Sequence, residues 1–366
     1  MMTLPNIAIL ADSRGFDTYF LNPAYGEAGY GYDRTFAFVL RHALLNEADP
    51  VADVCHIPDH FRAATIENNI IRLGLTDPAM VVLLDGIWET LLSKADFLRW
   101  AEREISDHEW RDGAKLDLSF DSHRLVELFK SGQLDVSPTR YARRQRRLLS
   151  YFSRRRRQVV WLTLPVPPRE HLAGRHYAGD YLTFPGWGDC LRALNDELAP
   201  LVTRHGGRVL DLNALMNANG GAGACLIDQW HFTPAFHQTI ADELRALITK
   251  AMAERTVPDD HISHQFMLPR VPGDVPVAVV GQPNAVNDWI AHHPQAAVAE
   301  RCGRDEAPDS DAKLVLLLDD DEDRRDAKAL ELLNALPMDR IVVYADELEP
   351  LVNPPGGDRT QYGRLG

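Results

Sequence analysis

The chain has 366 residues, of which 45% are hydrophobic and 25% charged, and 39 Lys and Arg against 53 Asp and Glu give it a formal net charge of −14. This length exceeds what one hydrophobic core usually serves, so we expect two domains. The acidic balance argues against a general binder of nucleic acid or of anionic membranes. The sequence also lacks a run of about 18 apolar residues, so it predicts no transmembrane segment.

The N-terminus and the cysteines indicate a compartment. Residues 1–5 lead straight into an apolar run, without the basic segment, long apolar stretch and cleavage site of a secretion signal. The four cysteines form no C-x-x-C pair, which argues against a zinc site and against a disulfide framework. We therefore expect a cytoplasmic protein that needs no metal and no cofactor.

Strand and helix signals alternate over residues 1–255, which is typical of a parallel α/β sheet. The expected strands are residues 7–10, 51–56, 80–84, 159–164 and 208–212. The expected helices are residues 35–45, 64–73, 188–205 and 234–253, with a mostly polar and helical excursion over 89–150. The apolar runs "AMVVLLDG" and "VVWLTLPV" suit strands buried on both faces, so we predict a three-layer sandwich.

The pattern changes after residue 255. Residues 256–273 are rich in Pro, His and Asp and lack periodicity, as expected of a linker. Strand and helix signals resume over 274–352, which predicts a second, smaller α/β domain followed by a flexible tail over 353–366. Within the second domain, the single glycine Gly281 is too weak a signal for a phosphate-binding loop. The run Asp319 to Asp321 suits a helix cap better than a cation site.

Two distant segments carry residues that suit nucleophilic catalysis. Ser13 follows the first strand in "LADSRG", where open α/β sheets place their chemistry. Asp228 and His231 stand three apart just before the helix that ends the first domain. An imidazole can take the proton of a serine hydroxyl, and it does so best when a carboxylate fixes its tautomer.

The segments "LADSRG", "VVLLDGIWETL" and "DQWHFTPAFHQTIADEL" together resemble the SGNH (GDSL-type) hydrolases over about residues 5–253. The resemblance implies a flavodoxin-like sandwich in which Ser13 is the nucleophile and also an oxyanion donor through its N–H. It further implies that His231 is the general base and that Asp228 orients it. It says nothing about the second domain.

The chain departs from that family at the other two oxyanion donors. Arg62 or Ala63 falls nearest to the family's glycine, and a backbone N–H there can still donate. Gly86-Ile87-Trp88-Glu89 stands where the family has Gly-x-Asn-Asp, so Trp88 takes the place of the Asn. Three alternatives follow: Arg14, Arg62 or a nearby Asn donates instead, the reaction differs, or the site binds without turnover.

The expected substrate is a small-molecule or glycan ester. Hydrolysis and O-acyl transfer need the same triad, and a catalytically silent binding or assembly protein is the competing class. Trp88 and Glu89 would suit a sugar ring, although both also suit the first turn of a helix. A nucleotide-binding flavodoxin-like protein is a third reading, but the sequence has no convincing phosphate loop.

The nine arginines between Arg140 and Arg157 are the main local exception to the acidic balance. They could hold an anionic ligand. The favoured interpretation is an amphipathic helix with a solvated basic face that leads into the strand at Val159.

Overall fold

The computed structural model describes much of the chain in two compact units, which are treated separately below. One unit is Met1–Ala63 with Thr76–Leu268, and the other is Ala64–Leu75 with Pro269–Gly366. The structure describes residues 4–12, 14, 34–46, 50–58, 69–71, 73–74, 78–87, 90–93, 98, 106, 122–134, 137–168, 176–177, 181–182, 184, 186–253, 275–294, 296–319, 321–337 and 340–345. The predicted linker over 256–273 and the predicted tail over 353–366 lie outside these residues.

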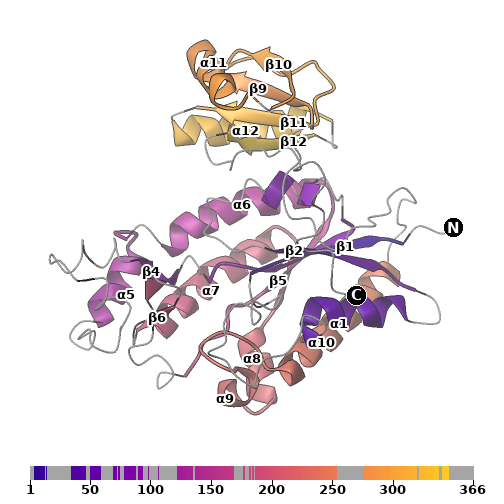
Figure 1. The fold of residues 1–366 in the computed structure, drawn as a ribbon, viewed down its shortest axis with the longest axis vertical. Helices are drawn as coiled ribbons and strands as arrows, with labels where there is room; N and C mark the ends of the chain where they lie inside the picture. The colour runs from indigo at the N-terminus through magenta and orange to yellow at the C-terminus, as the bar shows by residue number, and fades with distance from the viewer. Residues whose placement is uncertain are drawn as a thin grey trace. The chain divides into compact units, whose positions relative to one another are not determined.

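A five-stranded parallel sheet forms the centre of the first unit (Figure 1). Its apolar strands β1 and β3 are buried along their whole length, as the continuous apolar runs predicted. The register places Ile7 of β1 beside Val54 on one side and Met80 on the other. In spatial order the strands are β2 (Asp53–Pro58), β1 (Asn6–Ala11), β3 (Met80–Leu84), β5 (Gln158–Leu162) and β8 (Arg208–Leu210).

Helices cover both faces of this sheet, which makes a three-layer α/β sandwich of flavodoxin-like winding, as predicted. Helices α1 (Phe36–Leu45), α8 (Leu212–Ala218) and α10 (Pro234–Ala253) share one core with the sheet. Helices α6 (Pro138–Arg154) and α7 (Trp187–Arg204) pack together against β5, on the opposite side of the sheet in Figure 1. The smaller elements are α5 (Ser122–Lys130), α9 (Ala222–Cys225) and the antiparallel strands β4 (Leu92–Ser93), β7 (Tyr181–Leu182) and β6 (His176–Tyr177).

The arginine-rich segment forms the amphipathic helix that the sequence predicted. Helix α6 buries Tyr141, Leu148 and Phe152, whereas Arg140 and Arg146 are exposed. Pro138 at its first turn and the Ser137 side chain, which accepts a hydrogen bond from Arg140 N, fix the start of the helix.

Some predicted boundaries were wrong. Strand β8 ends at Leu210 rather than 212, because the Asp211 carboxylate accepts from Asn213 N and Ala214 N and begins α8 at Leu212. Strand β5 ends at Leu162 rather than 164. Beyond it, the side chain of Asn195 both donates to and accepts from the backbone of Leu164.

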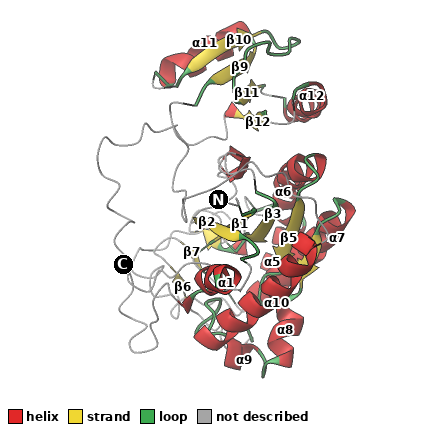
Figure 2. Ribbon diagram, turned by 90° about the vertical axis from the view of Figure 1, so that its right-hand side faces the viewer, coloured by secondary structure: helices red, strands yellow, loops and turns green. Residues whose placement is uncertain are grey.

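The second unit contains a four-stranded parallel sheet with its own core (Figure 2). In spatial order its strands are β10 (Val298–Cys302), β9 (Val277–Gly281), β11 (Leu314–Leu318) and β12 (Ile341–Tyr344). Helix α11 (Pro283–His292) follows β9, and α12 (Glu322–Ala335) follows β11. Asp321 caps α12 by accepting from Arg324 N, as the acidic run predicted.

The described surface gives no sign of a membrane-spanning element. No helix in the described part of the chain is both long enough and apolar enough to cross a bilayer.

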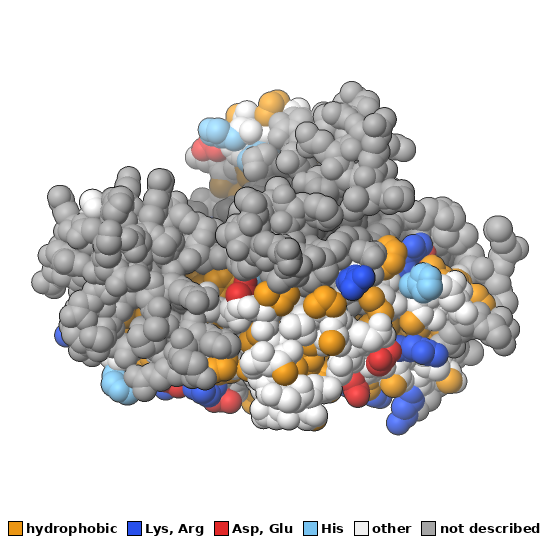
Figure 3. Space-filling model, turned by 60° about the horizontal axis from the view of Figure 1, so that its bottom comes forward, with side chains coloured by type: hydrophobic (Ala, Val, Ile, Leu, Met, Phe, Trp, Pro, Cys, Tyr) orange, Lys and Arg blue, Asp and Glu red, His pale blue; other side chains and the backbone are white. Residues whose placement is uncertain are grey.

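On the face drawn in Figure 3, basic side chains of the described residues lie in small groups mixed with acidic ones. All four cysteines are buried and unbridged.

Candidate functional site

A buried histidine–carboxylate pair occupies the loop before α10. The distance from His231 Nδ1 to Asp228 Oδ2 is 2.7 Å, and the two side chains are only 5% and 11% exposed. Asp228 Oδ1 accepts from the backbone N–H groups of Trp230 and His231 at 2.9 and 2.8 Å. Because Nδ1 donates to the carboxylate, the Nε2 atom of a neutral His231 is the nitrogen that can accept a proton.

The charge of Asp228 is stabilised despite its burial. Burial opposes the carboxylate, but the hydrogen bond and charge of His231 and the two backbone N–H groups outweigh it, so the pKa of Asp228 lies below its ordinary value. The loop itself is closed by hydrogen bonds from Ile227 N to His231 O and from Thr233 N to Cys225 O, both 2.9 Å. The ring is therefore held in one orientation beside an ionised acid.

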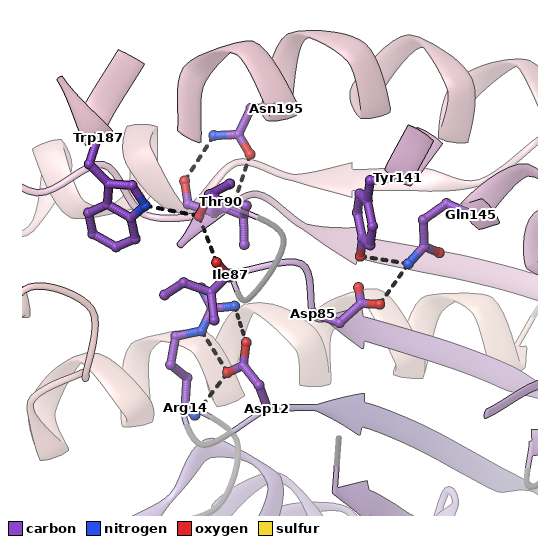
Figure 4. A network of polar contacts seen from close by, with 10 residues as sticks. Asp12, Arg14, Asp85, Ile87, Thr90, Tyr141, Gln145, Trp187 and Asn195 are labelled. Atoms are coloured by element: carbon purple, nitrogen blue, oxygen red, sulfur yellow. Dashed lines mark hydrogen bonds and ion pairs between the residues drawn. The ribbon is translucent and has the colours of Figure 1, made fainter. Parts of the chain in front are cut away.

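Asp12 and Arg14 bracket the position of Ser13 at the carboxyl end of β1. Asp12 N donates to Leu84 O at 3.1 Å, which extends the pairing of β1 with β3. Its carboxylate accepts from both Arg14 N (3.0 Å) and Arg14 Nε (2.7 Å), and from Arg14 Nη2 (Figure 4). Both side chains are buried, so the two neighbours of Ser13 are fixed to each other.

A second carboxylate, Asp85, follows the adjacent strand β3. Gln145 Nε2 of α6 donates to Asp85 Oδ2 at 2.6 Å and lies 2.6 Å from Tyr141 Oη. The pKa of Asp85 is raised to about 6, chiefly by burial; hydrogen bonds from Tyr141 and Gln145 oppose the rise, and the negative charge of Asp12 adds to it. The sequence analysis did not single out Asp85, whose partners lie about sixty residues away along the chain.

Gly86 makes the turn that leaves β3. Its φ is +98°, and a Cβ atom there would lie 2.9 Å from Tyr141 Oη. Only glycine fits both the backbone conformation and the space. The structure therefore gives Gly86 a steric role at the start of the segment that contains Trp88.

A chain of contacts joins this turn to the histidine loop. Thr90 Oγ1 donates to Ile87 O at 2.6 Å and accepts from Trp187 Nε1 of α7 at 3.0 Å (Figure 4). The Trp187 ring meets the Trp230 ring edge to face, with centroids 5.5 Å apart, and Trp230 precedes His231. The carboxyl end of β3 and the His231 loop are thus connected through α7.

The sequence-predicted site residues divide into two groups. The structure pairs Asp228 with His231, places Arg14 against Asp12 and puts Gly86 at the exit of β3. The others lie outside the described residues; they are Ser13, Arg62, Ala63, Trp88 and Glu89.

Comparison with known proteins gives low similarity throughout. No family model matches the chain, and no curated protein matches it. Among solved structures, LAE5, an α/β-hydrolase enzyme from the metagenome of Lake Arreo, is 16% identical, with 69% of this chain and 98% of its own covered and a TM-score of 0.42.

Two further solved structures give similar values. The extracellular lipase of Streptomyces rimosus is 12% identical, with 66% of this chain and 99% of its own covered and a TM-score of 0.40. A lipase/acylhydrolase from Enterococcus faecalis is 15% identical, with 70% and 100% covered and a TM-score of 0.36. At these identities and TM-scores, no activity of those proteins is inferred for this chain.

Proposed function

We propose that the first unit is a serine acyl hydrolase that cleaves an oxygen ester through an acyl-serine intermediate. Ser13 is the nucleophile, His231 the general base and Asp228 the group that orients and steadies His231. The observation that carries the proposal is the 2.7 Å contact of His231 Nδ1 with a buried, ionised Asp228. A histidine held in this way is ready to take a proton at Nε2.

The reaction proceeds in two displacements. Ser13 Oγ attacks the ester carbonyl while its proton passes to His231 Nε2, and the resulting tetrahedral oxyanion collapses to the acyl-serine as His231 protonates the departing alcohol. Water, deprotonated by His231, then attacks the acyl carbon; the bond from that carbon to Ser13 Oγ breaks as His231 returns the proton to Ser13, and the acid is released. The Asp228 carboxylate stabilises the imidazolium that forms in both displacements.

The oxyanion needs donors that differ from the usual set. The N–H of Ser13 supplies one, and a backbone N–H at Arg62 or Ala63 supplies the second, whereas Trp88 cannot present an amide as an Asn does. Loss of one such donor costs on the order of 10²–10³ in rate, so we expect a slow esterase. Arg14 is largely committed to Asp12, and its Nη1 is buried without a hydrogen-bond partner among the described residues.

The substrate that we favour is an O-acylated sugar or glycosylated metabolite. Trp88 provides a surface on which a sugar ring could stack, and Glu89 an acceptor for its hydroxyls. If a sugar hydroxyl replaces water in the second displacement, the same three residues make an O-acyltransferase. The substitution of Trp88 for an Asn supports the competing class, a protein that binds such a ligand without turning it over.

Labelling with a fluorophosphonate, followed by peptide mapping, tests the proposal. We expect one adduct on Ser13 in the native protein and none in Ser13→Ala, with His231→Ala labelling at least a hundredfold more slowly. Ser150→Ala, which changes a half-buried serine of α6, is the matched control and should label like the native protein. A folded native protein that takes up no label would contradict the proposed hydrolase activity. The competing class, a protein that binds the ligand without turnover, would then remain.

A further inference from the structure

Two buried tryptophans lie in series beside the histidine loop. Trp187, the first residue of α7, is 0% exposed, and Trp230, which directly precedes His231, is 3% exposed. The Trp187 and Trp230 rings meet at an interplanar angle of 77°, and the centroids of the Trp230 and His231 rings are 5.9 Å apart. Because close-packed side chains transmit displacements, the Trp187 ring limits where Trp230 can lie.

The Trp187 ring is held in one orientation by the hydrogen bond of its N–H group. Nε1 donates to Thr90 Oγ1 at 3.0 Å, and Thr90 Oγ1 in turn donates to Ile87 O at 2.6 Å (Figure 4). Thr90 is only 1% exposed, so an indole N–H that turned away from it would be left unsatisfied in the interior of the protein. The Thr90 hydroxyl therefore fixes the rotation of the ring.

Trp230 supports the Asp228–His231 pair through its backbone as well as through its ring. Its N–H donates to Asp228 Oδ1 at 2.9 Å, while Asp228 Oδ2 lies 2.7 Å from His231 Nδ1. A displaced Trp230 therefore changes the direction of the carboxylate and the place of the imidazole at the same time. Because a hydrogen bond weakens steeply as its geometry departs from the optimum, a small displacement weakens the contact of His231 with Asp228.

A third tryptophan of the same unit separates packing from hydrogen bonding. Trp161 of β5 is 1% exposed, and its Nε1 is buried without a hydrogen-bond partner among the described residues. The core of this unit thus holds an indole whose N–H is not bonded. The bond from Trp187 to Thr90 is therefore a contribution beyond burial, and Trp161 provides a comparison in which that contribution is missing.

We propose that Trp187 is a positioning residue for His231, which it supports through Trp230 while Thr90 anchors it. The inference rests on the proposed function, since the position of His231 controls a rate only if Nε2 takes the proton of Ser13. A misplacement of about 1 Å at a reacting group can cost about a hundredfold in rate. A side chain that touches no substrate can therefore control the reaction.

Fluorophosphonate labelling of the full chain tests the proposal. Trp187→Phe keeps an aromatic ring but loses the N–H group, and Thr90→Val keeps the shape but loses the hydroxyl. Each should label Ser13 about ten- to a hundredfold more slowly than the native protein. The double variant should be no slower than the slower single variant, because both changes remove the same bond. Thr90→Ser retains the hydroxyl and should stay within about threefold of the native rate.

Trp161→Phe is the matched control. It also replaces a buried indole by a phenyl ring, but it breaks no hydrogen bond among the described residues, so it should label within about threefold of the native rate. Equal slowing in Trp161→Phe and Trp187→Phe would show a general effect of loosened packing and would overturn the proposal. Native rates in both Trp187→Phe and Thr90→Val would overturn it as well.

Proton NMR distinguishes failure of this inference from failure of the proposed function. The proton between His231 Nδ1 and Asp228 Oδ2 lies in a short, charge-assisted hydrogen bond, so we expect it at low field in the native spectrum and absent in His231→Gln. It should shift in Trp187→Phe and in Thr90→Val, and stay in place in Trp161→Phe. These shifts in a protein that takes up no label would contradict the hydrolase alone. A resonance that is absent from the native spectrum, or unmoved in both variants, would contradict the positioning role.

Discussion

His237 Nδ1 of α10 accepts a hydrogen bond from the first backbone N–H of α1, Phe36 N, at 3.1 Å, across 201 residues of sequence. The Thr35 side chain makes no cap at this helix end, so the imidazole takes that role. The ring stacks on Phe36 and meets Phe232 edge to face. This contact requires an unprotonated Nδ1.

The first prediction is that the stability of the fold falls in mild acid because of His237. Burial, and to a lesser degree the charge of His231, lowers the pKa of His237 from 6.5 to about 3. A lowered histidine pKa gives stability that is complete above pH 6.5 and is lost progressively as the pH falls toward 3, with an upper bound of about 5 kcal/mol. Urea unfolding at several pH values should show a smaller loss in His237→Gln, with exposed His42→Gln as the control.

The second prediction concerns Asp85, whose titration has the opposite sign. Its pKa is raised from 3.8 to about 6, so its contribution to stability is complete below pH 3.8 and is lost as the pH rises through 6. Asp85→Asn keeps an acceptor for Gln145 and removes the buried charge, so it should raise the free energy of unfolding at pH 7.5 by about 1–3 kcal/mol. The gain should vanish near pH 4, and a loss of stability at pH 7.5 would contradict the assignment.

The third prediction separates two costs of a side chain at Gly86: backbone strain at positive φ and steric overlap with Tyr141. Gly86→Ala meets both a φ of +98° and the Tyr141 ring, and should cost about 2–4 kcal/mol. Gly206→Ala, where φ is +76° and no atom lies within 4 Å, should cost only about 1 kcal/mol. Chemical denaturation of both variants and of Gly86→Ala with Tyr141→Phe, which should recover part of the loss, checks this explanation.

The fourth prediction tests the buried Asp12–Arg14 pair. Arg14→Met leaves the Asp12 carboxylate buried and unpaired, which should cost about 3–5 kcal/mol. The double variant Asp12→Asn with Arg14→Met should be less destabilised than the sum of the single variants, because it leaves no uncompensated charge. A strictly additive cycle would show that the pair is not coupled.

The fifth prediction concerns the proposed catalysis. Asp228→Asn keeps an oxygen for the N–H groups of Trp230 and His231 but loses the acceptor of His231 Nδ1. We therefore expect nearly native stability with a fall of about 10³–10⁴ in the rate of fluorophosphonate labelling. Labelling at the native rate would exclude Asp228 from the reaction.

The sequence predicted the elements whose signals are local. Helix α10 begins and ends where predicted, because Pro234 starts the apolar periodicity, and β3 matches its apolar run. The sequence carries no clear strand signal at β10, because its exposed and half-buried residues alternate without an apolar run, as is usual for an edge strand. Predicting it needs knowledge of its partner β9.

The same distinction holds for the candidate sites. The pairing of Asp228 with His231 follows from their spacing of three and was predicted. Asp85 meets Gln145 only because α6 packs beside the end of β3, and Arg304 meets Asp319 only because the second sheet brings the ends of β10 and β11 together. Neither contact has a signature in the order of the residues.

The strand order of the two sheets has a consequence for how the chain can be studied. In each unit the first strand lies inside the sheet, the second lies on one side and the third on the other. Asp85 and Asp319 are therefore counterparts, since each follows the third strand of that winding and each has an arginine nearby. The chain thus has an aspartate after the third strand of each sheet. The effect of substituting Asp85 on the stability of the first unit can therefore be compared with the second unit of the same molecule, in which Asp319 is unchanged.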